Sequence, residues 1–271
     1  DGDGLDFNAD FQHSAFQAGV YGVPTYILQD ANGATTQRYF GREHLPRIAW
    51  CLTGEQGPAP DIAYESGFDA GRTPPATRSL TVCVDFKSAG AYLAVQPTIA
   101  MARDAGIGLQ WRIIRAAALR EPIDPGAKPD RGALHKYTRG RYVLDDLRRY
   151  AAHELSGLHD AQRTDFAAAG LLWVIDKQGD TDAYVTAVFA RYWQQRANID
   201  SVAAIAEVLA GLGIEVSGFA GFVETSGVAQ AQSQREDLAG QGISFSPTYL
   251  LESEPFQGRQ HLPLLRSLLD S

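Results

Sequence analysis

Apolar and polar positions along the chain predict a mixture of buried strands and amphipathic helices. Two short apolar runs with β-branched residues, at 79–86 and 109–115, predict buried strands, and 88–105 between them predicts a helix. Between about 131 and 240 apolar residues recur at helical spacing. The clearest stripes contain Leu144, Leu147, Ala151 and Leu155; Val185, Val188, Phe189, Tyr192 and Trp193; and Ile205, Val208, Leu209 and Leu212. A last helix is predicted to carry Leu262, Leu265 and Leu269 on one stripe.

One sequence pattern occurs twice. The paired segments are "GVYGVPTY" at 19–26 with "GISFSPTY" at 242–249, and "FGREHLPRI" at 40–48 with "QGRQHLPLL" at 257–265. Each copy predicts a helix, a strand that begins at Pro-Thr-Tyr, a hairpin, a second strand and a closing helix, and Asn32-Gly33 marks the first hairpin. We therefore interpret residues 1–52 as the C-terminal half of a first module, in a tandem duplication whose first front half this chain lacks.

The repeat and the composition together predict the domain organisation. Residues 53–79 are rich in glycine and proline without periodicity, which indicates a linker. Residues 80–271 then form a complete α/β module, with its sheet and flanking helices at 80–126 and 241–271 and a helical insert at 127–240. A hairpin with one helix buries too little apolar surface to be stable alone. The half-module is thus expected to dock within the chain or on another chain, for example in a homodimer.

Charge and cysteine content exclude several classes of protein. The net charge of −8 argues against a nucleic-acid partner, and no apolar run is long enough to span a membrane. Cys51 and Cys83 are far apart and form no CxxC pattern, which favours two reduced thiols in a cytoplasmic protein. His153 and His159 are six residues apart, so they do not share a helix face as metal ligands would, and no metal is expected.

Three stretches resemble a known family. They are "DFKSAGAYLA" (85–94), "GISFSPTYLL" (242–251) and "FQGRQHLPLL" (256–265). All three are similar to motifs of the DsbA-like family, in particular of 2-hydroxychromene-2-carboxylate isomerases, which are close to kappa-class glutathione transferases. The resemblance covers 80–271 and, as the half-copy, roughly 5–64. It implies an α/β, thioredoxin-like fold with an inserted all-helical subdomain, preceded by the C-terminal half of a second thioredoxin-like copy.

The resemblance implies glutathione as cofactor and Ser88 as the catalytic residue. In oxidoreductases of this fold the first helix begins at a CxxC motif, but here Ser88 holds the leading position and the helix has no cysteine. Thiol–disulfide exchange needs a thiolate, so that activity is not expected. A hydroxyl at a helix N-terminus would instead stabilise a glutathione thiolate that adds reversibly to an organic substrate and isomerises it. The alternative role of Ser88 is a helix N-cap.

Further ligand-binding residues follow from the same resemblance. Pro247, like Pro24 in the half-copy, matches the cis-proline of the family, although a tight turn alone would also explain it. Ser246 would then offer its backbone to the peptide part of glutathione. Trp111 matches a tryptophan that follows the second strand.

The last turn of the module supplies three more candidates. Arg259 and His261 would bind an anionic substrate at the N-terminus of the last helix, and Gln260 occupies the place of an acidic residue suited to the amine of glutathione. Arg259 and His261 recur in the half-copy as Arg42 and His44, and this repetition favours an architectural role for Arg259 and His261.

Some positions depart from the family pattern. Ala89-Gly90 replaces the usual Pro-Tyr, Ile113 replaces a proline, and Gln260 is not acidic. These changes weaken the expectation of glutathione more than that of the fold. Two alternatives therefore stay open: a DsbA-family oxidoreductase that lacks its CxxC motif, and a thioredoxin-fold binding module without catalytic activity.

Overall fold

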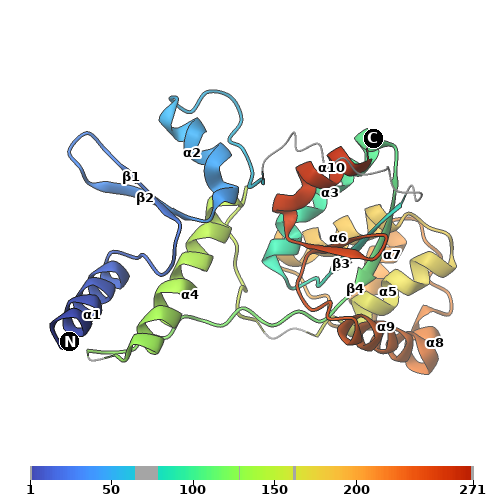
Figure 1. Cartoon of the computed structure of the whole chain (residues 1–271). Coiled ribbons are helices and arrows are strands. Elements are labelled where there is room, and N and C mark those ends of the chain that lie inside the picture. The colour runs from blue at the N-terminus through green and yellow to red at the C-terminus, as the bar shows by residue number, and fades with distance from the viewer. Residues whose placement is uncertain (1, 65–78, 128, 161–162, 270–271) are drawn as a thin grey trace. The chain divides into compact units, whose positions relative to one another are not determined.

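The chain folds into two compact units. The computed structural model describes residues 2–64, 79–127, 129–160 and 163–269. Its contacts assign 1–64 and 120–151 to an N-terminal unit, and 65–119 and 152–271 to a C-terminal unit (Figure 1). Most of the linker predicted at 53–79 lies outside the described residues, and the predicted domain boundaries stay a prediction.

The membrane question has a direct answer from helix length and polarity. No helix in the described ranges combines the length and apolar character needed to cross a bilayer.

The C-terminal unit is built on a four-stranded mixed sheet of order β4-β3-β5-β6. Strands β3 and β4 are parallel, whereas β3 with β5 and β5 with β6 are antiparallel. The chain order of strand, helix, strand, helical region, hairpin and helix agrees with the order predicted from periodicity. The strands are β3 (Ser79–Val84), β4 (Gly108–Ile113), β5 (Thr248–Leu251) and β6 (Glu254–Gln257).

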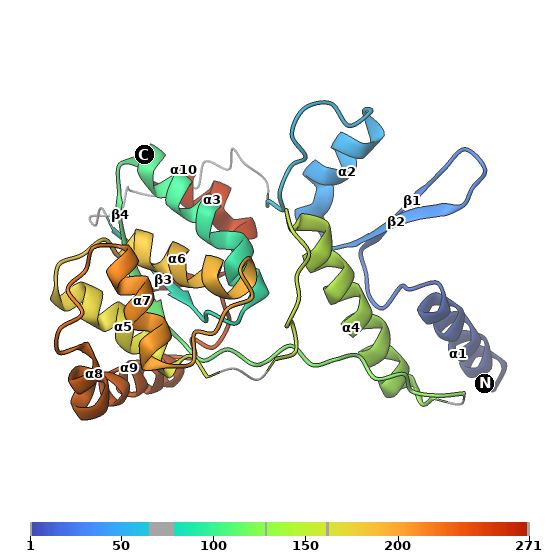
Figure 2. The ribbon, with the colours of Figure 1, turned by 180° about the vertical axis from the view of Figure 1, so that it is seen from behind.

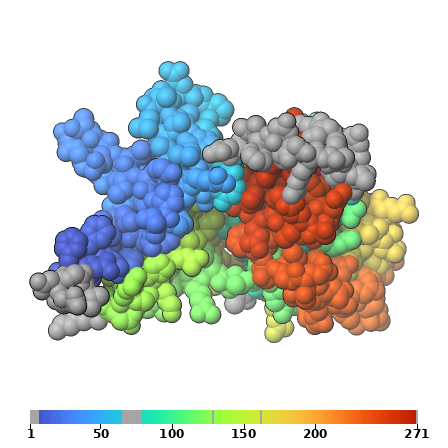
Figure 3. All heavy atoms as spheres, in the orientation of Figure 1, coloured from blue at the N-terminus to red at the C-terminus, as the bar shows by residue number. Residues whose placement is uncertain are grey.

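Helices cover both faces of this sheet. On one face Thr98 of α3 hydrogen-bonds the hydroxyl of Tyr249 at 2.8 Å, and α10 packs on α3. On the other face Cys83 forms an apolar cluster with Leu238 of α9. In Figure 3 the last part of the chain, coloured red, forms part of the surface of this unit. The helices are α3 (Ala89–Ala105), α9 (Val228–Gly240) and α10 (Leu262–Leu269).

The rest of the C-terminal unit is a helical layer, visible in Figure 2. Two of the predicted stripes are confirmed, because Val185, Val188 and Phe189 and then Ile205 and Leu209 are buried. The indole of Trp193 donates to the carbonyl of Phe86 at 3.0 Å and so ties this layer to the end of the sheet. Its helices are α5 (Asp165–Asp176), α6 (Thr181–Trp193), α7 (Val202–Gly211) and α8 (Phe219–Phe222), which a short π-helical segment connects to α9.

Two predicted stripes need correction. Helix α4 ends at Tyr150, so Ala151 and Leu155 do not continue the stripe of Leu144. Leu155 is buried, but in the C-terminal unit, and apolar spacing cannot show that a chain passes from one core to another. In α10 the buried third leucine is Leu268, not Leu269.

The N-terminal unit combines a hairpin with three helices. Helix α4, which lies far along the sequence, supplies partners to the hairpin. The hydroxyl of Tyr142 accepts from the Phe40 N–H at 2.7 Å, and the guanidinium of Arg149 donates to the Arg38 carbonyl at 2.8 Å. The elements are α1 (Gly2–Gln17), β1 (Thr25–Gln29), β2 (Thr35–Phe40), α2 (Leu45–Leu52) and α4 (Arg131–Tyr150).

The two repeated segments have the same local geometry. Both predicted cis-prolines are confirmed, at Val23–Pro24 and Ser246–Pro247. The proline carbonyl accepts from the N–H of Gly41 at 3.1 Å in one copy and of Gly258 at 2.9 Å in the other. These glycines have φ of 101° and 91°, which a side chain would disfavour. In each copy a 3₁₀ turn and an eight-residue helix follow.

Candidate functional site

Ser88 forms the N-cap of α3. Strand β3 ends at Val84, and the chain then turns so that the Ser88 N–H donates to the Asp85 carbonyl at 2.9 Å. Ser88 has extended backbone angles, and its Oγ accepts from the N–H of Ala91 at 3.3 Å. A serine in this position satisfies one of the free N–H groups of the first helical turn. The N-cap alternative is therefore confirmed as one role of Ser88.

The cis-proline turn lies directly against this cap. The Ser88 hydroxyl donates to the carbonyl of Ser246 at 3.1 Å. In return, the Oγ of Ser246 accepts from the N–H of Asp85 at 2.8 Å. A Cβ added to Gly90 would lie 3.9 Å from Cδ of Pro247, so the first turn of α3 faces the proline ring. The fold thus brings together three of the residues that sequence analysis singled out.

A fourth residue, Asp85, completes this cluster and was missed by sequence analysis. Its side chain is fully buried, and its two carboxylate oxygens accept from the N–H groups of Lys87 at 3.1 Å and Ala116 at 2.8 Å. Burial raises the pKa of Asp85, and these two backbone hydrogen bonds oppose the shift. The available signal was an aspartate at the end of an apolar strand, three residues before an N-cap serine.

The helical layer closes over the same loop. Beside the Trp193 bond to Phe86, the ring of Tyr92 stacks on Trp193 with centroids 5.7 Å apart. The amide of Gln194 donates to the Tyr92 hydroxyl at 3.1 Å. The end of α6 therefore holds the first turns of α3 in place.

The other predicted site residues make structural contacts. Trp111 is buried and its indole donates to Asp182 of α6 at 2.6 Å. Arg259 is buried, and the His261 ring packs edge-on against Phe256. The Gln260 amide donates to the carbonyl of Gln257 at 2.8 Å. Of the predicted site residues, Ser246 and Pro247 form the cluster with Ser88 in the described structure. Ligand contacts of Trp111, Arg259, Gln260 and His261 stay predictions.

Neither cysteine lies on α3 or in the loop that precedes it. Cys83 lies on β3 with a fully buried side chain, and burial raises the pKa of its thiol to about 12. Cys51 belongs to the N-terminal unit, where its sulfur lies 3.7 Å from the Tyr39 hydroxyl. Within the described ranges, no group of three or more histidine, cysteine or acidic side chains could hold a metal ion.

The donor set at α3 fits one part of glutathione. A helix N-terminus with a hydroxyl cap suits an anionic sulfur, because N–H groups and the positive dipole end lie there. Ala89 and Gly90 have minimal side chains; Ala89 is buried, whereas Ser88 and Gly90 are half-buried. The Gln260 amide, in contrast, offers no carboxylate to an ammonium group. The residues therefore fit a small thiolate better than the amino end of the tripeptide.

Comparison with known proteins identifies the family. Residues 83–270 match the model of the DSBA-like thioredoxin domain. The chain belongs to this family. Its fold is thus the predicted thioredoxin-like α/β fold with a helical insertion. A comparison with curated proteins gives no match.

Solved structures support the fold of this DSBA-like protein. A 2-hydroxychromene-2-carboxylate isomerase is similar with 24% identity and a TM-score of 0.52, over 70% of this chain and 93% of that one. A putative protein disulfide isomerase from Nitrosomonas europaea is similar with 15% identity and a TM-score of 0.54, over 73% and 97%. Both structures share the fold of this chain, and the fold alone does not decide its activity.

Proposed function

We propose that the C-terminal unit is a glutathione-dependent isomerase of the 2-hydroxychromene-2-carboxylate type, with Ser88 as its catalytic residue. The observation that carries the proposal is the Ser88 hydroxyl at the tip of α3, 3.1 Å from the Ser246 carbonyl beside cis-Pro247, on a helix without cysteine. This geometry favours the binding of an external thiolate over thiol–disulfide exchange by the chain itself.

Each residue of the cluster has a separate task in this proposal. The Ser88 hydroxyl rotates from the Ser246 carbonyl to the ligand sulfur and donates to it, while its lone pair keeps the bond to the Ala91 N–H. The free N–H groups of the first turn add the positive end of the helix dipole. The backbone N–H of Asp85 binds the Ser246 hydroxyl, which keeps the Ser246 carbonyl beside the cap. When bound, glutathione supplies the sulfur nucleophile that the chain lacks.

The test separates the cap from the ligand contact. Ser88→Asp keeps an N-cap acceptor but places a negative charge where the sulfur would bind. We expect this variant to lose at least about tenfold in glutathione affinity, measured by calorimetry at pH 8. Its melting temperature should fall only moderately, because the cap acceptor is kept while the donor to the Ser246 carbonyl is lost. Isomerase activity on 2-hydroxychromene-2-carboxylate should fall with it.

Ser201→Ala is the matched control, because Ser201 caps α7 in the same way, with its Oγ 3.2 Å from the Ala204 N–H. It should lose stability, about 1 kcal/mol, without loss of glutathione affinity. Equal glutathione binding by the wild type and Ser88→Asp would reject the proposal.

The N-terminal unit supports a second candidate function, that of a docking module. Leu250 of β5 lies opposite Pro255 across the hairpin. Because Pro255 has no N–H to donate, the backbone N–H and C=O of Leu250 point to β3 instead. In the repeated segment Ile27 corresponds to Leu250, but no strand beyond β1 and β2 occurs in the sheet described for this unit. The Ile27 side chain is 43% exposed, whereas Leu250 packs on the core. A strand with the chemistry of β3, from a thioredoxin-type front half, would complete this sheet.

Hydrogen exchange tests this open edge in the intact protein. We expect the Ile27 amide to exchange at least about a hundredfold faster than the amide of Tyr26, which pairs with Tyr39 of β2. A synthetic peptide with the sequence of 79–86 should slow exchange of the Ile27 amide in the wild type. Binding of the same peptide, measured by calorimetry, should be lost in Ile27→Pro, where the edge donor is removed. Equal protection of both amides without peptide would show that the edge is already covered.

A further inference from the structure

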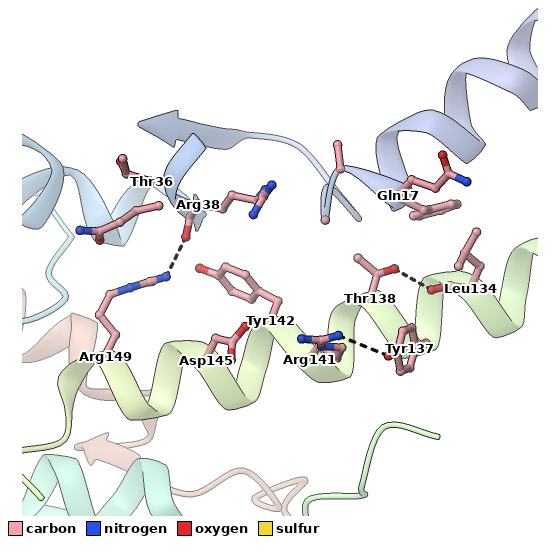
Figure 4. A pocket seen from close by; sticks show the side chains of 14 residues that line it. Gln17, Thr36, Arg38, Leu134, Tyr137, Thr138, Arg141, Tyr142, Asp145 and Arg149 are labelled. Atoms are coloured by element: carbon pink, nitrogen blue, oxygen red, sulfur yellow. Dashed lines mark hydrogen bonds between the residues drawn. The ribbon is translucent and has the colours of Figure 1, made fainter. Parts of the chain in front are cut away.

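A cavity of about 780 Å³ lies inside the N-terminal unit, between the end of α1, strand β2 and helix α4 (Figure 4). Phe16, Tyr137 and Tyr142 give it aromatic walls, and Thr36 and Thr138 line it with hydroxyl-bearing side chains. Its volume falls in the range of pockets that hold small organic molecules. The cavity belongs to the N-terminal unit alone and contains none of the residues around Ser88.

Three arginines line the cavity, and one of them, Arg149, already has hydrogen-bond partners within the folded unit. The guanidinium of Arg149 donates to Asp146 at 2.7 Å and to the Arg38 carbonyl at 2.8 Å. It also lies 4.2 Å from the centroid of the Tyr39 ring. These contacts use the charge and both terminal nitrogens of Arg149, so its role is to join α4 to the hairpin.

Arg38 is the second arginine, and its guanidinium is not paired with a carboxylate in the described part of this unit. Its Nε is buried without a hydrogen-bond partner. Figure 4 shows the side chain directed away from Arg149, along the cavity toward the end of α1. There it packs beside Gly19, where a Cβ would lie 3.3 Å from Nε. A buried charged donor without an acceptor costs free energy, and an oxyanion in the cavity would remove that cost.

Arg141 is the third arginine and approaches the cavity from α4. Its one described hydrogen bond, to the Tyr137 hydroxyl, is long at 3.4 Å. The nearest acidic groups are otherwise engaged or solvated. Asp146 is bound by Arg149, and Asp145 is 61% exposed and lies 3.8 Å from Arg148. The cavity therefore has two guanidinium groups available against one solvated carboxylate.

We propose that this cavity binds a small organic anion. Arg38 and Arg141 hold its carboxylate or phosphate group, because the guanidinium fork matches either oxyanion. An aromatic or apolar body packs against Phe16, Leu134 and Tyr137. The site is distinct from the cluster at Ser88 and does not depend on the isomerase proposal.

Binding of two probes to the whole chain tests the proposal. Phenylacetate and phenyl phosphate are titrated at low ionic strength, with affinity measured by calorimetry and contacts by amide chemical shifts. We expect at least one probe to bind in the low millimolar range or tighter, and the tighter of the two identifies the headgroup. Arg38→Gln and Arg141→Gln should each weaken binding about tenfold. Arg141 is exposed, so its variant should fold even if Arg38→Gln does not.

Two control variants make the test specific. Arg148→Gln removes an exposed charge of α4 that does not line the cavity, and it should leave the affinity unchanged. Ser88→Asp should also leave it unchanged, which separates this site from glutathione binding. Three results would overturn the proposal: no binding of either probe, equal losses in Arg148→Gln and Arg38→Gln, or inorganic phosphate binding as tightly as phenyl phosphate.

Discussion

Replacement of Ser88 by cysteine is expected to give the C-terminal unit the reactive thiol that it lacks. The new sulfur would lie at the N-terminus of α3, where free N–H groups and the helix dipole stabilise a thiolate and lower the thiol pKa. An ordinary thiol is only a few per cent ionised at pH 7, so a lowered pKa raises the thiolate fraction more than tenfold. Part of this gain is lost because a less basic thiolate is a weaker nucleophile. We therefore expect alkylation by iodoacetamide at pH 7 to be about 5- to 10-fold faster than for an unperturbed thiol.

The matched control places cysteine at the opposite end of the same helix. Ala105 lies in the last turn of α3, where the dipole disfavours a negative charge. Ala105→Cys should react no faster than an ordinary thiol. Reduction of insulin disulfides tests the oxidoreductase alternative, with dithiothreitol as the external reductant that releases the mixed disulfide. We expect no rate above the dithiothreitol background from the wild type, whose Cys83 is buried, and a gain only with Ser88→Cys. Equal alkylation rates at both ends of α3 would contradict the assignment of the helix tip as an anion site.

Loss of the Asp85 carboxylate is expected to produce the largest change in stability. Asp85→Ala leaves the part-buried N–H groups of Lys87 and Ala116 without their acceptor. Each unsatisfied donor costs about 1–3 kcal/mol, and a small cavity adds to this. We expect the free energy of unfolding to fall by about 3 kcal/mol, measured by urea denaturation of the C-terminal unit.

The pH profile gives Asp85 a separate signature. Since burial raises its pKa in the folded state, the native protein binds this proton more tightly than the unfolded chain does. The associated stability is complete below the unfolded pKa, about 4, and is lost as the pH rises through the folded value. Asp85→Asn should lack this decline. Asp237→Asn, an exposed substitution on α9, should retain it, and a decline that persists in Asp85→Asn would assign it to another group.

Sequence patterns predicted most of the C-terminal unit because its strands and helices follow their own periodicity. The run 79–86 gave β3 within two residues of its observed end, and α6 and α7 bury the stripes expected of them. Helix α4 was predicted as a helix but assigned to the insert. An apolar stripe shows that a helix is buried on one face but not which core it packs against. The contacts of α4 to the hairpin depend on single polar groups, such as the Tyr142 hydroxyl and the Arg149 guanidinium.

The candidate site was predictable to a similar degree. The sequence motifs around Ser88 and Pro247 were enough to expect a helix tip beside a cis-proline turn, because serine is a preferred helix N-cap and cis peptide bonds are found almost only before proline. Asp85 was not found, because a single aspartate after a strand has many ordinary roles in turns. The hydrogen bond of the Trp111 indole to Asp182, a residue 71 positions away in sequence, could not be predicted from local pattern, and the expected ligand contact of Trp111 stays a prediction.

The position of α4 in the chain has a consequence for biosynthesis. Residues 120–151 belong to the N-terminal unit, although 65–119 precede them and 152–271 follow them in the other unit. Nascent 1–64 must therefore wait until residue 150 has left the ribosome before Tyr142, Arg149 and Tyr150 can join it. For the same reason a protease that cuts once after residue 64 would release no free fragment, and a shortened gene beginning beyond that point would encode an α4 with its polar partners missing.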